Sequence, residues 1–157
     1  MFIYTLKAST LKMFAAICLS LVAVITLIAF LPTTTENIAV IQEKKIDYTG
    51  ITTNENRITF LSQFGWEVKN VPVNSTETII PTEFDSLFSG YNEIQKRQGL
   101  DLSEYKGNKV MKYTYEILNY PNYEGKVYAN LLIYRNRVIG GDICSAEITG
   151  FIHGFEK

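Results

Sequence analysis

Three residues near the carboxyl end have the side chains that a cysteine hydrolase needs: Asp142, Cys144 and His153. A thiolate nucleophile requires a general base, and the base requires a group that orients it. Asp142 and Cys144 are two residues apart, so on a strand they share a face, and His153 on a neighbouring strand can reach them. The pattern has low specificity, because one cysteine and one histidine can be paired in this way in any small domain. We therefore keep an envelope hydrolase as an alternative and interpret Cys144 first as a small buried thiol.

Motifs for metal or cofactor binding are not found. One histidine and scattered carboxylates do not supply the ligands of a structural zinc site, and no calcium-loop pattern is present. Gly140-Gly141 lacks the strand-to-helix context of a phosphate-binding loop. The sequence thus predicts no metal and no cofactor, and it favours a protein that is not an enzyme.

A second group of residues suits binding rather than catalysis, because tyrosines and asparagines concentrate in one predicted hairpin. These side chains supply flat contact area and adaptable hydrogen bonds at modest entropic cost. Such a surface fits a peptide, a wall glycan or an envelope protein. The alternative is that the rings stabilise a half-exposed sheet across its strands. The candidate binding residues are Tyr120, Asn122, Tyr123, Tyr128, Asn130 and Tyr134.

The last third of the chain, which carries all these candidates, is predicted to be strands. Apolar and polar residues alternate over 110–118, and 126–134 is rich in Val, Leu, Ile and Tyr. A third strand is expected over 138–145, where Gly140-Gly141 indicates a bulge or a close backbone approach. A short edge strand is expected within 148–155.

Two helices are predicted before these strands. The first follows an N-cap among residues 52–54 and ends at Gly65, and the second runs from about 83 to 98 with Thr82 as its N-cap. Helices that precede a meander imply an α+β fold with about two helices on one face of an antiparallel sheet. Two shorter strands are predicted over 66–71 and near 76–80.

The amino-terminal part has a different composition. Residues 13–31 contain no charge, and as a helix of about 1.5 Å per residue they match a bilayer core of about 30 Å. Lys7 and Lys12 precede this segment and Glu36 is the first charge after it, so the positive-inside rule keeps the tail in the cytoplasm. A cleaved signal peptide would have a shorter apolar region and small residues at its cleavage site. The predicted parts are a cytoplasmic tail (1–12), a transmembrane anchor (13–31), a stalk or first strand (32–49) and an extracytoplasmic domain (50–157).

The charge balance of the outer domain argues against nucleic-acid binding. The whole chain has 15 basic and 16 acidic residues, and two of the lysines precede the apolar segment. The remainder is therefore mildly acidic, whereas binding to phosphates needs a basic face.

Five segments occur in the order GWEVKNVPV, IPTEFDSLFSGYNEIQKRQGLDLSEYKG, YTYEILNYP, ANLLIY and VIGGDICSAEITGFIHGF. In this order they resemble an uncharacterised family of small, single-span exported proteins of Gram-positive bacteria, over roughly residues 55–155. The family is a domain of unknown function, so the resemblance implies no substrate, cofactor or catalytic residue. It implies a bacterial exterior location and one self-contained domain. We expect a non-enzymatic binding or interaction module at the cell envelope; the alternatives are a hydrolase using Cys144 and His153, or a structural subunit of a membrane complex.

Overall fold

The computed structural model describes residues 45–147 and 149–157. The predicted cytoplasmic tail, the predicted anchor over 13–31 and most of the predicted stalk lie outside the described residues. Within the described residues, no helix has the length and apolar character needed to cross a membrane.

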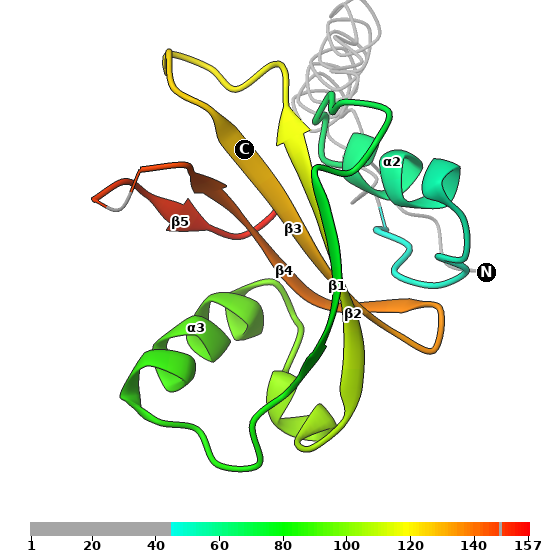
Figure 1. Cartoon of the computed structure of the whole chain (residues 1–157), viewed down its shortest axis with the longest axis vertical. Helices are drawn as coiled ribbons and strands as arrows, with labels where there is room; N and C mark the ends of the chain where they lie inside the picture. The colour runs from blue at the N-terminus through cyan, green and yellow to red at the C-terminus, as the bar shows by residue number, and fades with distance from the viewer. Residues whose placement is uncertain (1–44, 148) are drawn as a thin grey trace, which may run out of the picture. The chain divides into compact units, whose positions relative to one another are not determined.

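Five antiparallel strands form one sheet in the order β1-β2-β3-β4-β5, so each strand pairs with its neighbour in sequence (Figure 1). This is the predicted meander, and the bounds of β2, β3 and β4 fall within two residues of the predicted ranges. Residues 66–71 form only the isolated bridge between Val68 and Ile117 rather than a full strand. The strands are β1 (Asn74–Ile79), β2 (Lys109–Ile117), β3 (Val127–Tyr134), β4 (Arg137–Ser145) and β5 (Ile152–His153).

The first described helix, α2, comprises Asn54–Ser62. Its N-cap Thr53 forms a reciprocal capping box with Asn56, which satisfies backbone donors that the first turn leaves unpaired. Gly65 follows the helix with a φ of +80°, a left-handed conformation that favours glycine. The predicted helix is therefore confirmed, with its N-cap in the predicted segment.

The second helix, α3, comprises Ser86–Arg97 and begins three residues later than predicted. The reason is the cap: the Asp85 side chain, not that of Thr82, accepts a hydrogen bond from the backbone N–H of Phe88. A short 3-10 helix, η1 (Leu102–Tyr105), follows and buries Leu102.

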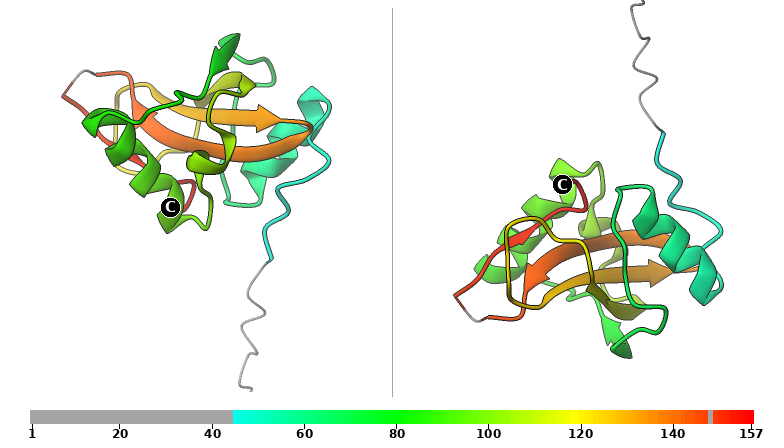
Figure 2. Two further views of the ribbon diagram at one scale, coloured as in Figure 1. Left: turned by 90° about the horizontal axis from the view of Figure 1, so that it is seen from below. Right: turned by 90° about the horizontal axis from the view of Figure 1, so that it is seen from above.

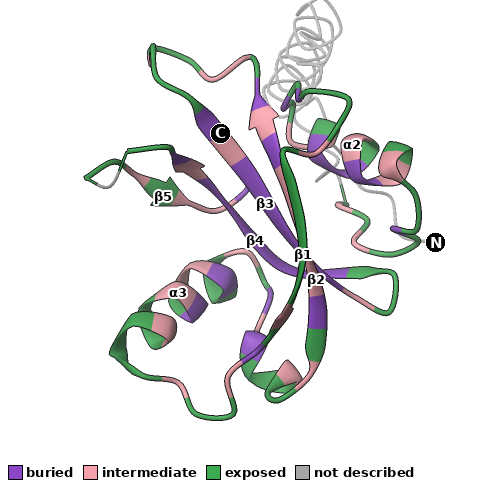
Figure 3. Cartoon of the chain, viewed as in Figure 1, coloured by how far each residue is buried: buried purple, intermediate pink, exposed green. Residues whose placement is uncertain are grey.

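Alternate residues of the strands face two different hydrophobic cores. Tyr115, Ala129 and Ile143 are paired across β2, β3 and β4, so their side chains share one face of the sheet. Phe60 and Leu61 of α2 belong to the same buried cluster. This larger core therefore lies between α2 and one face of the sheet. Figure 3 shows that buried residues are concentrated along β3 and β4, whereas β1 is mostly exposed.

The opposite face of the sheet carries the smaller core. Val110 and Leu132 form a cluster there with Leu102 of η1, and Phe88 and Tyr91 of α3 pack against it. The two helices thus cover opposite faces of the sheet and lie well apart in both further views (Figure 2). The α+β class is confirmed, but the prediction that both helices share one face is wrong. Helical periodicity does not determine the face of the sheet on which a helix packs, because that depends on contacts between residues distant in the sequence.

Part of the predicted stalk contributes to the larger core. Ile46 and Tyr48 pack against it, and the Tyr48 carbonyl accepts a 2.9 Å hydrogen bond from the Val138 backbone N–H. The folded domain therefore includes residues before position 50.

Candidate functional site

An open groove of about 810 Å³ lies between α3, the end of β1 and the sheet face that carries the smaller core. Leu87 on α3, Ile79 on β1 and Ile152 on β5 line it, although each is an exposed large apolar side chain. Leu87 is 82% exposed. Exposed apolar side chains that converge on one concavity are typical of a ligand-binding or interaction site, and the volume is within the range of small-molecule pockets.

The floor of the groove is polar, in contrast to its walls. Asn130 on β3 and Asp142 on β4 are only 6% and 4% exposed, and both line the groove. The Asn130 side-chain amide donates a 2.8 Å hydrogen bond to Asp142 Oδ2, and Tyr91 on α3 donates one of 2.8 Å to Asp142 Oδ1. The Thr114 hydroxyl on β2 donates to Asn130 Oδ1 at 2.7 Å. One hydrogen-bonded network therefore joins three strands to α3 beneath the groove.

The Asp142 carboxylate dominates the electrostatics of the floor. Burial, followed by the negative charge of Asp142, raises the pKa of the Cys144 thiol to about 11. The same two causes, in the same order, raise the pKa of Tyr91 well above its ordinary value. Both groups are therefore protonated near neutral pH, and the Tyr91 hydroxyl donates its proton to the carboxylate in a hydrogen bond.

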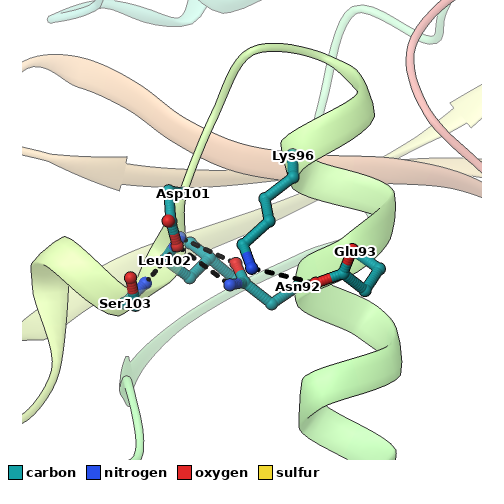
Figure 4. Close-up of polar contacts among 6 residues, drawn as sticks. All are labelled: Asn92, Glu93, Lys96, Asp101, Leu102 and Ser103. Atoms are coloured by element: carbon teal, nitrogen blue, oxygen red, sulfur yellow. Dashed lines mark hydrogen bonds and ion pairs between the residues drawn. The ribbon is translucent and has the colours of Figure 1, made fainter.

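A polar junction holds α3 in place beside the groove (Figure 4). The buried Asn92 side chain accepts a 2.8 Å hydrogen bond from the Leu102 backbone N–H and donates one of 2.9 Å to Asp101 Oδ1. Asp101 in turn accepts a 2.8 Å hydrogen bond from the Ser103 backbone N–H. These bonds join the carboxyl-terminal half of α3 to η1.

A glycine beside a β-bulge lets α3 and η1 approach the sheet closely. The register between β3 and β4 shifts beside Leu132, next to the two glycines, as the Gly140-Gly141 pair predicted. A Cβ on Gly140 would lie 2.9 Å from Leu102 and 3.2 Å from Gln95 Oε1, so only glycine fits here without displacing its neighbours. Gln95 Oε1 also accepts a 2.8 Å hydrogen bond from the Gly141 N–H.

The predicted hydrolase trio is not assembled. Asp142 and Cys144 share a face of β4 and both line the groove, as their spacing predicted. His153, however, pairs with Ile143, so its side chain lies on the opposite face. There its Nε2 is 3.1 Å from the Tyr120 hydroxyl. A cysteine without a base and with a raised pKa is not an activated nucleophile.

The predicted tyrosine and asparagine surface is divided between the two faces of the sheet. Tyr120 stacks on Trp66 at 5.5 Å, and Tyr123 packs against the same larger core, so these rings are structural. Tyr134 packs against the smaller core. The structure does not bring the six residues together as one patch. Asn122 is exposed in a turn with a φ of +55°, Tyr128 is half-buried opposite Cys144, and Asn130 alone lines the groove.

Tyr91 lines the groove but is not among the candidate site residues that the sequence indicates. Nothing in the sequence around Tyr91 indicates that its hydroxyl reaches a carboxylate. The sequence did contain a sign of the groove floor, because Asn130 and Asp142 each interrupt an otherwise apolar strand.

Among the described residues, no three His, Cys, Asp or Glu side chains cluster as metal ligands.

The comparisons with known proteins identify a family but no activity. The match to DUF4830, described as a domain of unknown function, covers residues 60–143, which is more than half of the chain. It extends from α2 to β4 and includes Tyr91, Asn130 and Asp142 of the groove. No curated protein and no solved structure shows a significant match. The chain belongs to the DUF4830 family.

Proposed function

We propose that this chain is a non-enzymatic binding module at the envelope of a Gram-positive bacterium, anchored in the membrane through residues 13–31, with the groove beside α3 as its ligand site. The observation that carries the proposal is the groove itself, in which exposed apolar walls surround a buried hydrogen-bonded floor. The uncharged segment 13–31, with lysines before it, supports the anchor and the outward orientation of the domain.

The chemistry of the floor favours binding over catalysis. The raised pKa of Cys144 keeps its thiol protonated at neutral pH, and His153 lies on the other face of the sheet. Asp142 already accepts hydrogen bonds on both oxygens, so it is held in a fixed orientation. Fixed polar groups within an apolar concavity orient a ligand and give specificity.

Gly90 supplies an independent argument that the groove is kept open. It lies in the interior of α3 and lines the groove, and a Cβ added there would meet no atom of the described residues within 4 Å. Glycine inside a helix costs about 1 kcal/mol relative to alanine. No steric need within the described part of the domain accounts for this cost, whereas free space for a ligand does.

Site-specific photo-crosslinking in producing cells tests the ligand site. A photoreactive phenylalanine analogue replaces Leu87 in the groove, and the matched control carries it at Leu118, which is exposed and does not line the groove. We expect one defined adduct, identified by mass spectrometry, from position 87 and none from position 118. The substitution Gly90→Phe, which fills the groove, should abolish it. Equal crosslinking at both positions, or an adduct that persists with Gly90→Phe, would contradict the proposed site.

The orientation of the domain is tested separately with a membrane-impermeant maleimide on intact cells. In a background with both native cysteines replaced by serine, Asn122→Cys, in an exposed turn, should be labelled without lysis. Thr10→Cys, in the expected cytoplasmic tail, should be labelled only after lysis. The reverse pattern would overturn the proposed topology.

A further inference from the structure

We infer that the ligand of the groove is a small amphiphilic amine whose protonated nitrogen binds at Asp142 and whose apolar part lies against Leu87 and Ile94. This inference rests on the proposed function, because it names the ligand class of that same groove. Three features carry it: an unpaired buried carboxylate, the net charge of the groove, and the size and polarity of its walls.

The Asp142 carboxylate has hydrogen bonds but no counter-charge among the residues that the structure describes. Within residues 45–147 and 149–157, the ion pairs are Lys69–Glu116, Lys96–Glu93 and Lys109–Glu77, and none includes Asp142. Its donors are the neutral groups of Tyr91 and Asn130. Two carboxylate oxygens offer about four lone-pair sites, so capacity for one more donor remains. A buried carboxylate without a cation is costly, and an ammonium group on a ligand would relieve that cost.

The charges that line the groove favour a cation. Glu83, Asp85 and Asp142 are acidic, and Lys112 is the single basic residue among the described residues of the lining. Lys112 is only half-buried. Among the groups that shift the pKa of the Cys144 thiol, Lys112 has the smallest effect. Because a charge in a less solvated position interacts more strongly, Asp142 rather than Lys112 is expected to select the ligand.

The dimensions and walls of the groove favour a small ligand with an apolar body. A volume of about 810 Å³ falls within the range of about 300 to 1,000 Å³ for small-molecule sites. Leu87, Phe88 and Ile94 of α3 offer apolar contacts and no hydrogen-bonding side-chain groups, which suits an alkyl or aryl group and not a glycan.

Three probes of matched shape separate charge recognition from apolar binding: 4-phenylbutylamine, 4-phenylbutanol and 4-phenylbutyrate. The full chain, with labelled Ile and Leu methyl groups, is reconstituted in lipid nanodiscs, and methyl shifts are followed during titration. Protein shifts report the groove directly, so partition of a probe into lipid does not imitate binding. We expect saturable shifts at Ile79, Leu87 and Ile152 with the amine, at a Kd at least ten-fold lower than for the alcohol or the carboxylate.

Two variants test the role of charge. Asp142→Asn should weaken amine binding at least ten-fold and leave alcohol binding unchanged, provided that the methyl shifts of Leu61 and Ile117 in the larger core show an intact fold. Lys112→Gln removes a competing cation without touching Asp142, and should strengthen amine binding several-fold. This second variant keeps the test decisive if Asp142→Asn fails to fold.

Each other outcome overturns the inference in a distinct way. Equal binding of amine and alcohol would show an apolar site without charge selection, and preference for the carboxylate would show recognition by Lys112. Crosslinking at position 87 without shifts from any probe would indicate a different ligand, such as a peptide, while the proposed function stands. If crosslinking at position 87 fails as well, the proposed function fails with the inference.

Discussion

Asn130 and Asp142 lie directly opposite each other on β3 and β4, and the Asn130 side-chain amide donates a 2.8 Å hydrogen bond to Asp142 Oδ2. Thr114 donates to the other end of the same amide, which fixes its orientation, and Tyr91 reaches Asp142 from α3. The same pair therefore orients the floor of the groove and links α3 to the sheet. A substitution at Asn130 or Asp142 should therefore change both the stability of the domain and the binding of a ligand in the groove.

Removing the amide tests this link. Asn130→Ala leaves Asp142 Oδ2 without a strong donor in a buried position, and losing a hydrogen bond to a charged group costs about 1.5 to 3 kcal/mol. We expect the free energy of unfolding, measured by urea denaturation, to fall by about 2 kcal/mol. Asn74→Ala, at an exposed position of β1, should change it by no more than about 0.5 kcal/mol. Equal effects of the two substitutions would show that the network contributes little.

The thiol of Cys144 should react slowly in the folded protein. Its pKa of about 11 leaves roughly one hundredth of the thiolate that an ordinary thiol has near pH 8. Alkylation by iodoacetamide, followed by mass spectrometry of the Cys144 peptide, should therefore be roughly 100-fold slower before denaturation than after it. The rate should rise with pH up to about 11, and Asp142→Asn should raise it by removing the adjacent negative charge. Rapid labelling of the native chain near pH 7 would restore the hydrolase alternative.

Much of the sheet could be predicted because its signals are local. Alternation fixes which residues of 109–117 share a face, and Gly140-Gly141 marks the bulge through the steric demands of a close backbone approach. The start of α3 was placed incorrectly because Thr82 and Asp85 are both good N-caps, and only tertiary packing decides between them. The side of the sheet that each helix covers is likewise a long-range property.

The candidate site could be predicted only in part. Asp142 and Cys144 were correctly expected to share a strand face, because that follows from their spacing alone. The placement of His153 depended on the register of β5 with β4, and a shift of one residue reverses the face of every side chain. Tyr91 could not be assigned to the site, since its hydroxyl meets Asp142 only when α3 is packed on the sheet.

Asp101 predicts a specific acid sensitivity of the junction between α3 and η1. Hydrogen bonds from Asn92, and then from Ser103, lower the pKa of Asp101 from 3.8 to about 2. Because the pKa is lower in the folded state, the ionised carboxylate stabilises the fold above about pH 4, and this contribution is lost as the pH falls from about 4 to about 2. Asp101→Asn keeps an acceptor oxygen, so it should flatten the dependence of unfolding free energy on pH in this window.

The control for Asp101 is Glu124→Gln, in an exposed loop. Urea denaturation of both variants at intervals between about pH 5 and pH 2 should show a reduced slope for Asp101→Asn alone. An unchanged slope in that variant would mean that the hydrogen bonds at Asp101 do not favour its charged form.

Two glycines of the α3 region should respond to alanine in opposite directions. Gly90 lies within α3 and has open space around its Cα, so Gly90→Ala should raise the free energy of unfolding by about 0.5 to 1 kcal/mol. Gly99 follows the helix with a φ of +74°, where a Cβ is strained, so Gly99→Ala should lower it by about 1 kcal/mol. Urea denaturation of the two variants measures both effects. If Gly90→Ala destabilises the domain instead, Gly90 has a structural role within the fold, and it no longer supports an open ligand groove.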